Sequence, residues 1–190
     1  MEKMADLMAQ EKFSIVSNAD KTLLIALDEE MAKLGYGIYE SIDAWEWSKN
    51  WFKARYQINY TITKMKKRKY MAHVFIKDDG SVILLRLLTE KIGANSHNTR
   101  QESCSFIDPH REYIENAPAH VKELFTKKSD CNHTHENENG FCWRLDTYTI
   151  NNVVYEKCVG KGFDFWNPTM EKLPDYMDLL SELKPKKTIQ

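Results

Sequence analysis

Long apolar runs and an excess of charge of either sign are both absent from this 190-residue sequence. The most apolar stretch, residues 82–88, is seven residues long and contains Arg86, whereas a membrane-spanning helix needs about 20 apolar residues. The first residues of the chain include the acidic side chains of Glu2 and Asp6 and no apolar segment, so they do not resemble a secretory signal. We therefore expect a cytoplasmic protein with no membrane partner.

Charge is nearly balanced, with 27 Lys and Arg residues against 28 Asp and Glu residues. No overall field would draw such a protein to nucleic acid or to an anionic membrane. A basic run at residues 64–69 has five cations in six positions, which is typical of a solvated hairpin tip that discourages edge-to-edge pairing. Nucleic-acid binding is therefore not the interpretation that we favour.

Linkers rich in Pro or Gly, internal repeats and low-complexity tracts are absent as well, and the chain has only 5 Pro and 7 Gly. Hydrophobic residues make up 42% of the sequence and charged residues 29%, which excludes general disorder. A chain of this length can bury a core without disulfides. We expect a single domain over residues 1–190.

Apolar residues at helical spacing predict helices in both terminal regions. Residues 4–12 predict a short helix, and a longer one is expected to be capped by Asn18 or Asp20 and to stop at Gly35. The apolar stripe of the longer helix consists of Leu23, Leu24, Leu27, Met31 and Leu34. Further helix starts are expected where prolines occur, at Asp108-Pro109, Asn116-Ala117-Pro118, Asn167-Pro168 and Leu173-Pro174. The final helix is expected to bury Tyr176, Met177, Leu180 and Leu183.

Strand patterns occupy the region between these helices. Residues 57–65, 70–77 and 81–88 predict a three-stranded meander. Asp78-Asp79-Gly80 is a hairpin signal because Gly tolerates the positive φ that such turns require.

A second hairpin is predicted from residues 143–150 and 153–159 around Asn151-Asn152, since Asn also adopts left-handed φ. The expected fold class is therefore α+β. An antiparallel sheet, made of the three-stranded meander plus the C-terminal hairpin, would pack with the N-terminal and C-terminal helices.

An aromatic cluster at residues 45–56 has two interpretations. It would serve either as core packing, because Trp and Tyr bury much area, or as a small-molecule binding module that stacks a base or a sugar. We favour core packing, because no second sign of a ligand site accompanies the cluster, and helical spacing is slightly favoured over strand spacing. The cluster consists of Trp45, Trp47, Trp51, Phe52 and Tyr56.

Cysteine and histidine residues concentrate in the C-terminal third. Zinc takes four ligands from thiolate and imidazole in tetrahedral geometry, and a short knuckle usually supplies two of them. The sharpest functional hypothesis is a structural zinc ion held by one of the two histidines and by the cysteines. The candidate ligands are Cys131, His133, His135, Cys142 and Cys158.

The predicted hairpin register raises an objection to this site. If Asn151-Asn152 is a two-residue turn, Cys158 faces Leu145, and in a regular strand Cys142 would point to the opposite face of the sheet. Convergence of the two cysteines requires that Cys142 precede the strand in a loop, or that a bulge shift the register.

Two other interpretations of the cysteines remain open. In the first interpretation, Cys142 and Cys158 are buried core residues, and residues 130–139 form a solvated loop. In the other they belong to an enzyme with a catalytic metal or thiol, for which Glu136 and Glu138 are nearby acid–base groups. Familiar catalytic templates, namely a Gly-rich phosphate loop, a Gly-x-Ser-x-Gly elbow and His-Glu-x-x-His, are absent from the sequence. Pairing Cys104 with His97 or His110 is a further conceivable nucleophile arrangement.

The C-terminal half also carries a recognisable order of features. The segment Tyr-Ile-Glu-Asn-Ala-Pro-Ala-His-Val-Lys-Glu-Leu-Phe at 113–125 leads to the Cys-containing knuckle. It is followed by a strand with Tyr148 and Ile150, by Tyr155-Glu156-Lys157-Cys158, by Phe163 and by an amphipathic helix. Over roughly residues 70–184 this order resembles a family of small bacterial proteins of unknown function with a Cys-rich segment before the last helix.

The resemblance implies no activity, but it implies that Cys131, Cys142 and Cys158 belong together. The family favours a further Cys in the knuckle where this chain has His133 and His135, which leaves the fourth ligand open. It also favours a turn Gly where this chain has Asn152.

Overall fold

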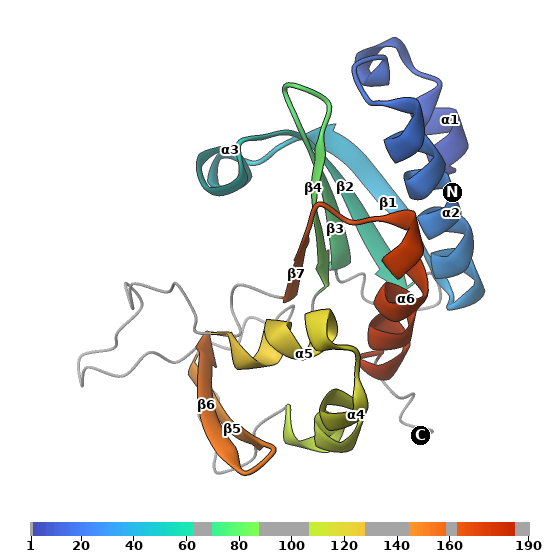
Figure 1. The fold of residues 1–190 in the computed structure, drawn as a ribbon. Coiled ribbons are helices and arrows are strands. Elements are labelled where there is room, and N and C mark those ends of the chain that lie inside the picture. The colour runs from blue at the N-terminus through green and yellow to red at the C-terminus, as the bar shows by residue number, and fades with distance from the viewer. Residues whose placement is uncertain (1, 63–69, 88–106, 128–144, 159–162, 185–190) are drawn as a thin grey trace, which may run out of the picture. The chain divides into compact units, whose positions relative to one another are not determined.

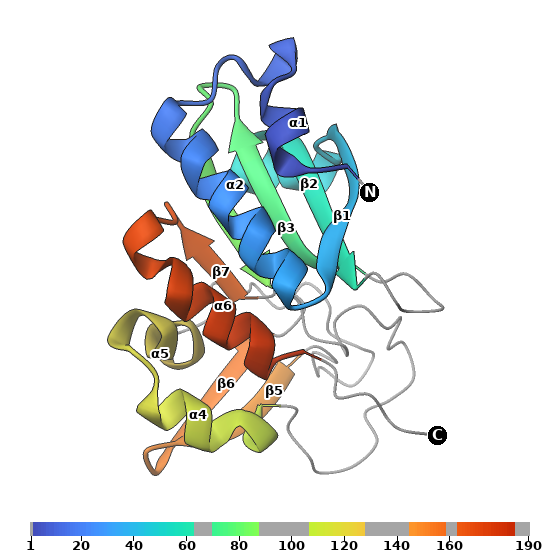
Figure 2. The same ribbon diagram turned by 90° about the vertical axis from the view of Figure 1, so that its right-hand side faces the viewer.

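A computed structural model of the chain describes residues 2–62, 70–87, 107–127, 145–158 and 163–184. The fold is α+β, as the sequence predicts (Figures 1 and 2). Two compact units are present: unit 1 comprises residues 1–88 and 164–177, and unit 2 comprises residues 89–163 and 178–190. The expectation of a single domain stays a prediction.

Unit 1 is built on a five-stranded sheet with the order β1-β2-β3-β4-β7. Strands β1 to β4 pair in antiparallel fashion, and β2 to β4 are the predicted meander. The sequence did not predict β1 and β7. The strands are β1 (Tyr36–Asp43), β2 (Ala54–Ile62), β3 (Tyr70–Lys77), β4 (Val82–Leu87) and β7 (Phe163–Trp166).

The predicted turn between β3 and β4 is confirmed. Gly80 has a φ of 82°, and its N–H donates to the carbonyl of Lys77 at 3.0 Å. The Asp79 carboxylate accepts hydrogen bonds from both the hydroxyl and the backbone N–H of Ser81, which lowers the pKa of Asp79. Left-handed backbone and a short acceptor side chain therefore close this hairpin.

One face of the sheet is covered by α1 (Met4–Met8) and α2 (Asn18–Lys33), as Figure 2 shows. Helix α2 is capped by Ser17, whose hydroxyl accepts from the N–H of Asp20 at 3.1 Å, rather than by Asn18 or Asp20 itself. Gly35 follows its end with a φ of 83°, as predicted. The predicted helix at residues 4–12 is shorter, because a separate 3-10 turn forms at Glu11–Phe13.

The interface between α2 and the sheet is a closely packed apolar core. The predicted stripe is buried at Leu23, Leu24, Leu27 and Met31, whereas Leu34 follows the end of the helix and is only half-buried. A cavity of about 10 Å³ remains there, which is at the lower limit for a single water molecule and far too small for a ligand. Its lining residues are Leu23, Leu24, Leu27, Val74, Val82, Pro168 and Tyr176.

A part-buried polar contact lies at the edge of this core. The Tyr60 hydroxyl donates to the Asp28 carboxylate at 3.2 Å, and the same carboxylate accepts from the N–H of Met4 at 3.0 Å. Burial, and secondarily the negative charge of Asp28, raises the pKa of Tyr60 well above its ordinary value. The phenol therefore stays a donor and ties both helices to β2.

Unit 2 contains short helices and the second predicted hairpin. Helix α4 (Arg111–Asn116) follows a 3-10 turn with Pro109 near its start, and α5 (Ala119–Thr126) follows Pro118, as predicted. The hairpin consists of β5 (Leu145–Ile150) and β6 (Val153–Cys158).

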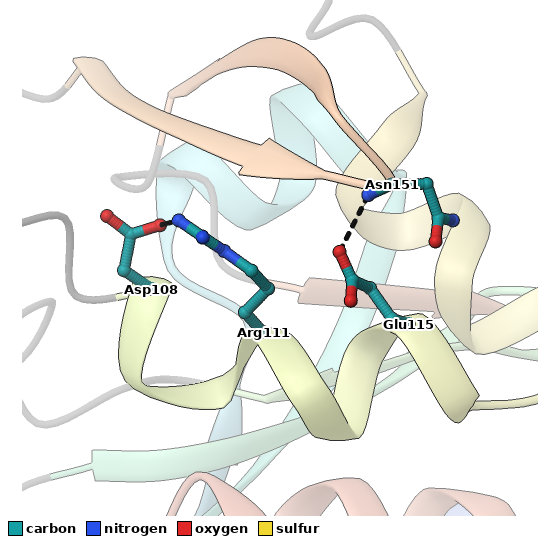
Figure 3. Close-up of polar contacts among 4 residues, drawn as sticks. All are labelled: Asp108, Arg111, Glu115 and Asn151. Carbon is teal, nitrogen blue, oxygen red and sulfur yellow. Dashed lines mark hydrogen bonds and ion pairs between the residues drawn. The ribbon is translucent and has the colours of Figure 1, made fainter.

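The hairpin register is the predicted one. Asn151 and Asn152 have φ values of 48° and 63°, Ile150 pairs with Val153, and Leu145 pairs with Cys158. Figure 3 shows that the Glu115 carboxylate of α4 accepts the N–H of Asn151 at 2.7 Å.

Two further contacts organise unit 2. The Tyr148 hydroxyl donates to the carbonyl of Phe125 in α5 at 2.5 Å. Arg111 pairs with Asp108 at 2.6 Å across the first turn of the helical segment (Figure 3). The turn end and the middle of the hairpin are thus attached to α4 and α5.

The last helix, α6 (Leu173–Glu182), begins in unit 1 and ends in unit 2. A 3-10 turn at Met170–Lys172 precedes it, and Asn167 has a φ of 49°. Burial of the four predicted positions is confirmed for Tyr176, Met177, Leu180 and Leu183. Within the part of the chain that the structure describes, no helix is both long and apolar enough to cross a membrane.

Candidate functional site

The second face of the sheet in unit 1 carries a buried row of polar side chains. Gln57 and Asn59 are fully buried on β2, and His73 on β3 is 3% exposed. Asn59 pairs with His73 across the strands, so the two side chains lie on the same face. Buried polar groups at this density are unusual on a sheet face and mark it for function or specificity.

A β-bulge brings Glu40 to this row. Ile38 pairs with Tyr60, whereas Glu40 pairs with Asn59, so Tyr39 is the extra residue on β1. In a regular strand Ile38 and Glu40 would share a face, but the extra residue turns Glu40 to the polar side. The Asn59 amide nitrogen then donates to the Glu40 carboxylate at 2.8 Å.

The side chains form a connected network. His73 Nδ1 lies 2.5 Å from Asn59 Oδ1, and Gln57 Nε2 lies 2.7 Å from the same oxygen. The hydroxyl of Ser48 on α3 (Glu46–Phe52) donates to Gln57 Oε1 at 2.8 Å. We call these five residues, Glu40, Ser48, Gln57, Asn59 and His73, the histidine network.

Aromatic rings cover the histidine network. Helix α3 lies on the opposite side of the sheet from α1 and α2 (Figure 1) and brings Phe52 to 5.1 Å from Phe75. Trp45 lies 5.9 Å from His73, edge to face, and 5.9 Å from Trp47. Lys53, with a φ of 55°, ends α3 in a left-handed residue and lets the chain enter β2.

The aromatic rings continue to the surface of unit 1. Trp47 lies 5.8 Å from Phe52, and Trp166 on β7 lies 5.9 Å from Phe52. Trp47 is 37% exposed and Trp166 is 55% exposed, whereas Phe52 is 8% exposed. We call Trp45, Trp47, Phe52 and Trp166 the aromatic surface.

The predicted aromatic cluster is thus divided between core and surface. Phe52 and Tyr56 are buried, as the core interpretation requires. Trp47 is exposed and Trp45 is only half-buried, and the Trp51 side chain lies outside the described residues. The helix predicted for this cluster ends at Phe52, and Tyr56 belongs to β2.

Most of the predicted zinc ligands lie outside the described residues, namely Cys131, His133, His135 and Cys142. The backbone of Cys158 ends β6, opposite Leu145 at the start of β5. Among the residues that the structure describes, no group of three or more His, Cys, Asp and Glu side chains is arranged to hold a metal. The zinc site stays a prediction.

The predicted nucleophile pair also falls largely outside the described residues. Cys104 and His97 are not described, and His110 has a partner in unit 2. Its Nδ1 lies 2.6 Å from the Glu182 carboxylate of α6.

No family model, curated protein or solved structure matches the chain. The resemblance of residues 70–184 to small bacterial proteins therefore stays a proposal. Function has to be inferred from the contacts within each unit.

Sequence reasoning missed the histidine network. The available signal was the alternation of Gln57, Asn59 and Thr61 with Ile58 and Tyr60 on β2. Such a pattern ordinarily predicts a sheet with one face in water. The polar face is buried here because α3 and its tryptophans cover it, which β2 alone does not reveal.

Proposed function

We propose that unit 1 is a small-molecule binding module whose ligand stacks on the aromatic surface. The observation that carries this proposal is the exposure of Trp47 and Trp166, each of which contacts the buried Phe52 ring. Exposed tryptophans that contact the same buried ring form an apolar surface, and exposed apolar patches often mark sites of ligand or protein binding.

The chemistry of the surface favours a flat, uncharged ring. Aromatic faces stack on bases and on the C–H faces of sugars, and a stacked ring contributes about 1–3 kcal/mol to binding. On α3, Glu46 and Lys49 pair with each other at 2.9 Å, so neither sign of charge dominates beside Trp47. An anionic ligand would find no cluster of cations in this part of α3.

The surface is held in place from below. Phe52 and Trp47 both contact Phe75 on β3, at 5.1 and 5.9 Å between ring centroids. Ser48 attaches the same helix to Gln57 through a buried hydrogen bond. Rings fixed in this way lose little conformational freedom on binding, which favours affinity.

The experiment is a titration with adenosine and with methyl glucoside, followed through the indole N–H signals of the tryptophans. We expect one of the two probes to shift the signals of Trp47 and Trp166, with affinity lost in Trp47→Ala and Trp166→Ala. Tyr39→Ala is the matched control, because Tyr39 is 40% exposed and does not belong to the aromatic surface. If neither probe moves these signals, the proposal fails for bases and sugars.

As a second function, we propose a structural zinc ion in unit 2 at the open end of the β5–β6 hairpin. The observation behind it is that β5 begins at Leu145, which pairs with Cys158, so the two cysteines converge if Cys142 lies in a loop before this strand. Three residues span at most about 11 Å, so Cys142 is within chain reach of a site beside Cys158. The remaining ligands would be Cys131 and one of His133 or His135.

Zinc would complement the contacts at the other end of the hairpin. Glu115 holds the turn, and Tyr148 holds the middle of β5. A metal at the open end would fix the hairpin there.

Thiolate ligands suit a reducing compartment, so a cytoplasmic location and membership of the bacterial Cys-rich family are part of this proposal. An enzyme with an open position on the same metal is the alternative.

A further inference from the structure

Each of the two exposed tryptophans of the aromatic surface has an exposed asparagine close to it in the chain. Asn50 follows Trp47 by three residues on α3, and side chains at that spacing are neighbours on a helix. Asn167 directly follows Trp166 at the end of β7. Among the residues that the structure describes, neither asparagine side chain has a hydrogen-bond partner. The surface therefore repeats one combination, an indole ring and a side-chain amide.

The backbone of Asn167 departs from the strand. In a regular strand the residue after Trp166 would point to the opposite face of the sheet. Asn167 instead has a φ of 49°, a left-handed conformation that Asn adopts more readily than most residues. Strand β7 ends at Trp166, so the alternation of faces does not apply to the Asn167 amide.

The two tryptophans are close enough to contact one ligand. The ring centroid of Phe52 lies 5.8 Å from that of Trp47 and 5.9 Å from that of Trp166. The indole centroids are therefore no more than about 12 Å apart. A ligand with two joined rings can stack one ring on each tryptophan, whereas a ligand with one ring system stacks on only one of them.

We propose that the ligand of the aromatic surface is a neutral oligosaccharide, an inference that rests on the binding function proposed above and names its substrate class. Two neighbouring sugar rings stack their C–H faces on Trp47 and Trp166. Their hydroxyls bind the amides of Asn50 and Asn167. A hydroxyl and a side-chain amide each donate and accept hydrogen bonds, so the two groups suit each other.

The charges on α3 agree with a neutral ligand. Glu46 and Lys49 pair with each other at 2.9 Å, and the amide of Asn50 carries no charge. A phosphorylated ligand would be favoured by unpaired cations, with which phosphate forms strong charge-assisted hydrogen bonds. An oligosaccharide needs rings and uncharged polar groups, which is what the surface offers.

The ligand class is tested by titration with cellobiose, whose equatorial hydroxyls leave the C–H faces of both rings open, and with sorbitol and adenosine. We expect cellobiose to shift the indole N–H signals of both Trp47 and Trp166, and sorbitol, which has hydroxyls but no ring, to shift neither. Cellobiose should bind at least about fivefold more tightly than methyl glucoside, because its second ring stacks on the second tryptophan. Equal affinities of these two sugars would overturn the use of both tryptophans. A response to adenosine alone would overturn the oligosaccharide and leave ring binding standing, and no response to any probe would count against ring binding itself.

Two variants test the amides. Asn50→Ala and Asn167→Gly each remove one amide, and Gly tolerates the left-handed φ at position 167. Each variant should weaken cellobiose binding about twofold to tenfold, the loss expected for one neutral hydrogen bond. Asn18→Ala is the matched control, because Asn18 is an exposed asparagine at the start of α2, on the other side of the sheet (Figure 1). Unchanged affinity in both variants would overturn the role of the amides, while shifts of the indole signals would still support ring binding.

A second copy of the chain is the competing occupant of this surface. We expect the indole signals of Trp47 and Trp166 to be independent of protein concentration when no ligand is present. Signals that change on dilution alone, together with a dimer in analytical ultracentrifugation, would show that another molecule covers the surface and would overturn the oligosaccharide.

Discussion

The turn at Gly80 offers the sharpest quantitative test of the packing in unit 1. An added Cβ at this glycine would lie 2.0 Å from the backbone oxygen of Ile15 and 2.6 Å from its carbonyl carbon. Ile15 lies just before α2, so this close approach ties the β3–β4 turn to the segment that leads into the helix. Both sides of the contact are backbone, and no flexible side chain can move away.

Two effects add in Gly80→Ala. A φ of 82° costs an L-residue about 1–2 kcal/mol, because Cβ approaches the following carbonyl oxygen. Relief of the overlap with Ile15 requires backbone shifts of the kind that overpacking produces, at about 1–3 kcal/mol. The expected loss is therefore about 2–5 kcal/mol, a large part of the 5–15 kcal/mol that stabilises an ordinary domain.

Gly35→Ala is the matched control, since Gly35 has nearly the same φ of 83°. Urea unfolding of the parent protein and of the two variants, fitted with one common m value, gives the free energy of unfolding that each variant loses. We expect Gly80→Ala to lose at least about 1 kcal/mol more of the free energy of unfolding than Gly35→Ala, because the added Cβ at Gly80 overlaps the backbone of Ile15. Equal losses would refute the close approach of Ile15, and no loss in either variant would refute the left-handed turn as well.

The remaining predictions concern the polar contacts and the metal. Asn59→Leu should lower the free energy of unfolding by about 3 kcal/mol or more, measured by thermal unfolding, because Glu40, Gln57 and His73 each lose a buried partner. A loss below about 1 kcal/mol would contradict the network. Tyr148→Phe should cost about 1–3 kcal/mol through the lost bond to Phe125, with the half-buried Tyr155→Phe near neutral as its control. Protein purified without chelator should carry about one zinc per chain by elemental analysis, and should lose it in Cys158→Ser but not in Cys104→Ser. A metal content near zero in the parent protein excludes the zinc proposal.

Elements governed by local rules could be read from the sequence. The α2 stripe of Leu23, Leu27 and Met31 repeats at the helical period, so its buried face was evident. Two adjacent left-handed asparagines permit a two-residue turn, and that turn fixes the pairing of Leu145 with Cys158. Proline-marked starts placed α5 and α6 within a residue or two.

Predictions failed where the decisive partner is distant in the chain. Strand β1 contains Gly37 and a bulge at Tyr39, so its residues do not alternate regularly, and only pairing with β2 makes it a strand. Strand β7 is four residues long and follows a segment with no strand pattern. Trp47 and Phe52 looked equivalent in sequence and both contact Phe75 on β3, but only the assembled structure shows that Trp47 is exposed and Phe52 is buried.

By itself, the sequence determined the α+β class, the meander, the hairpin register and the apolar face of α2, because each depends on residues within a few positions of one another. The tertiary structure alone decided that Glu40 turns toward Asn59, that His73 contacts Trp45 and that Trp47 and Trp166 both contact Phe52. Apart from Trp47 and Phe52, which are five positions apart, these contacts join residues 19 to 114 positions apart, as between Glu40 and Asn59 or between Phe52 and Trp166. No local pattern encodes such contacts, because they form only when the sheet has assembled, with the bulge at Tyr39 and the left-handed Lys53 in place.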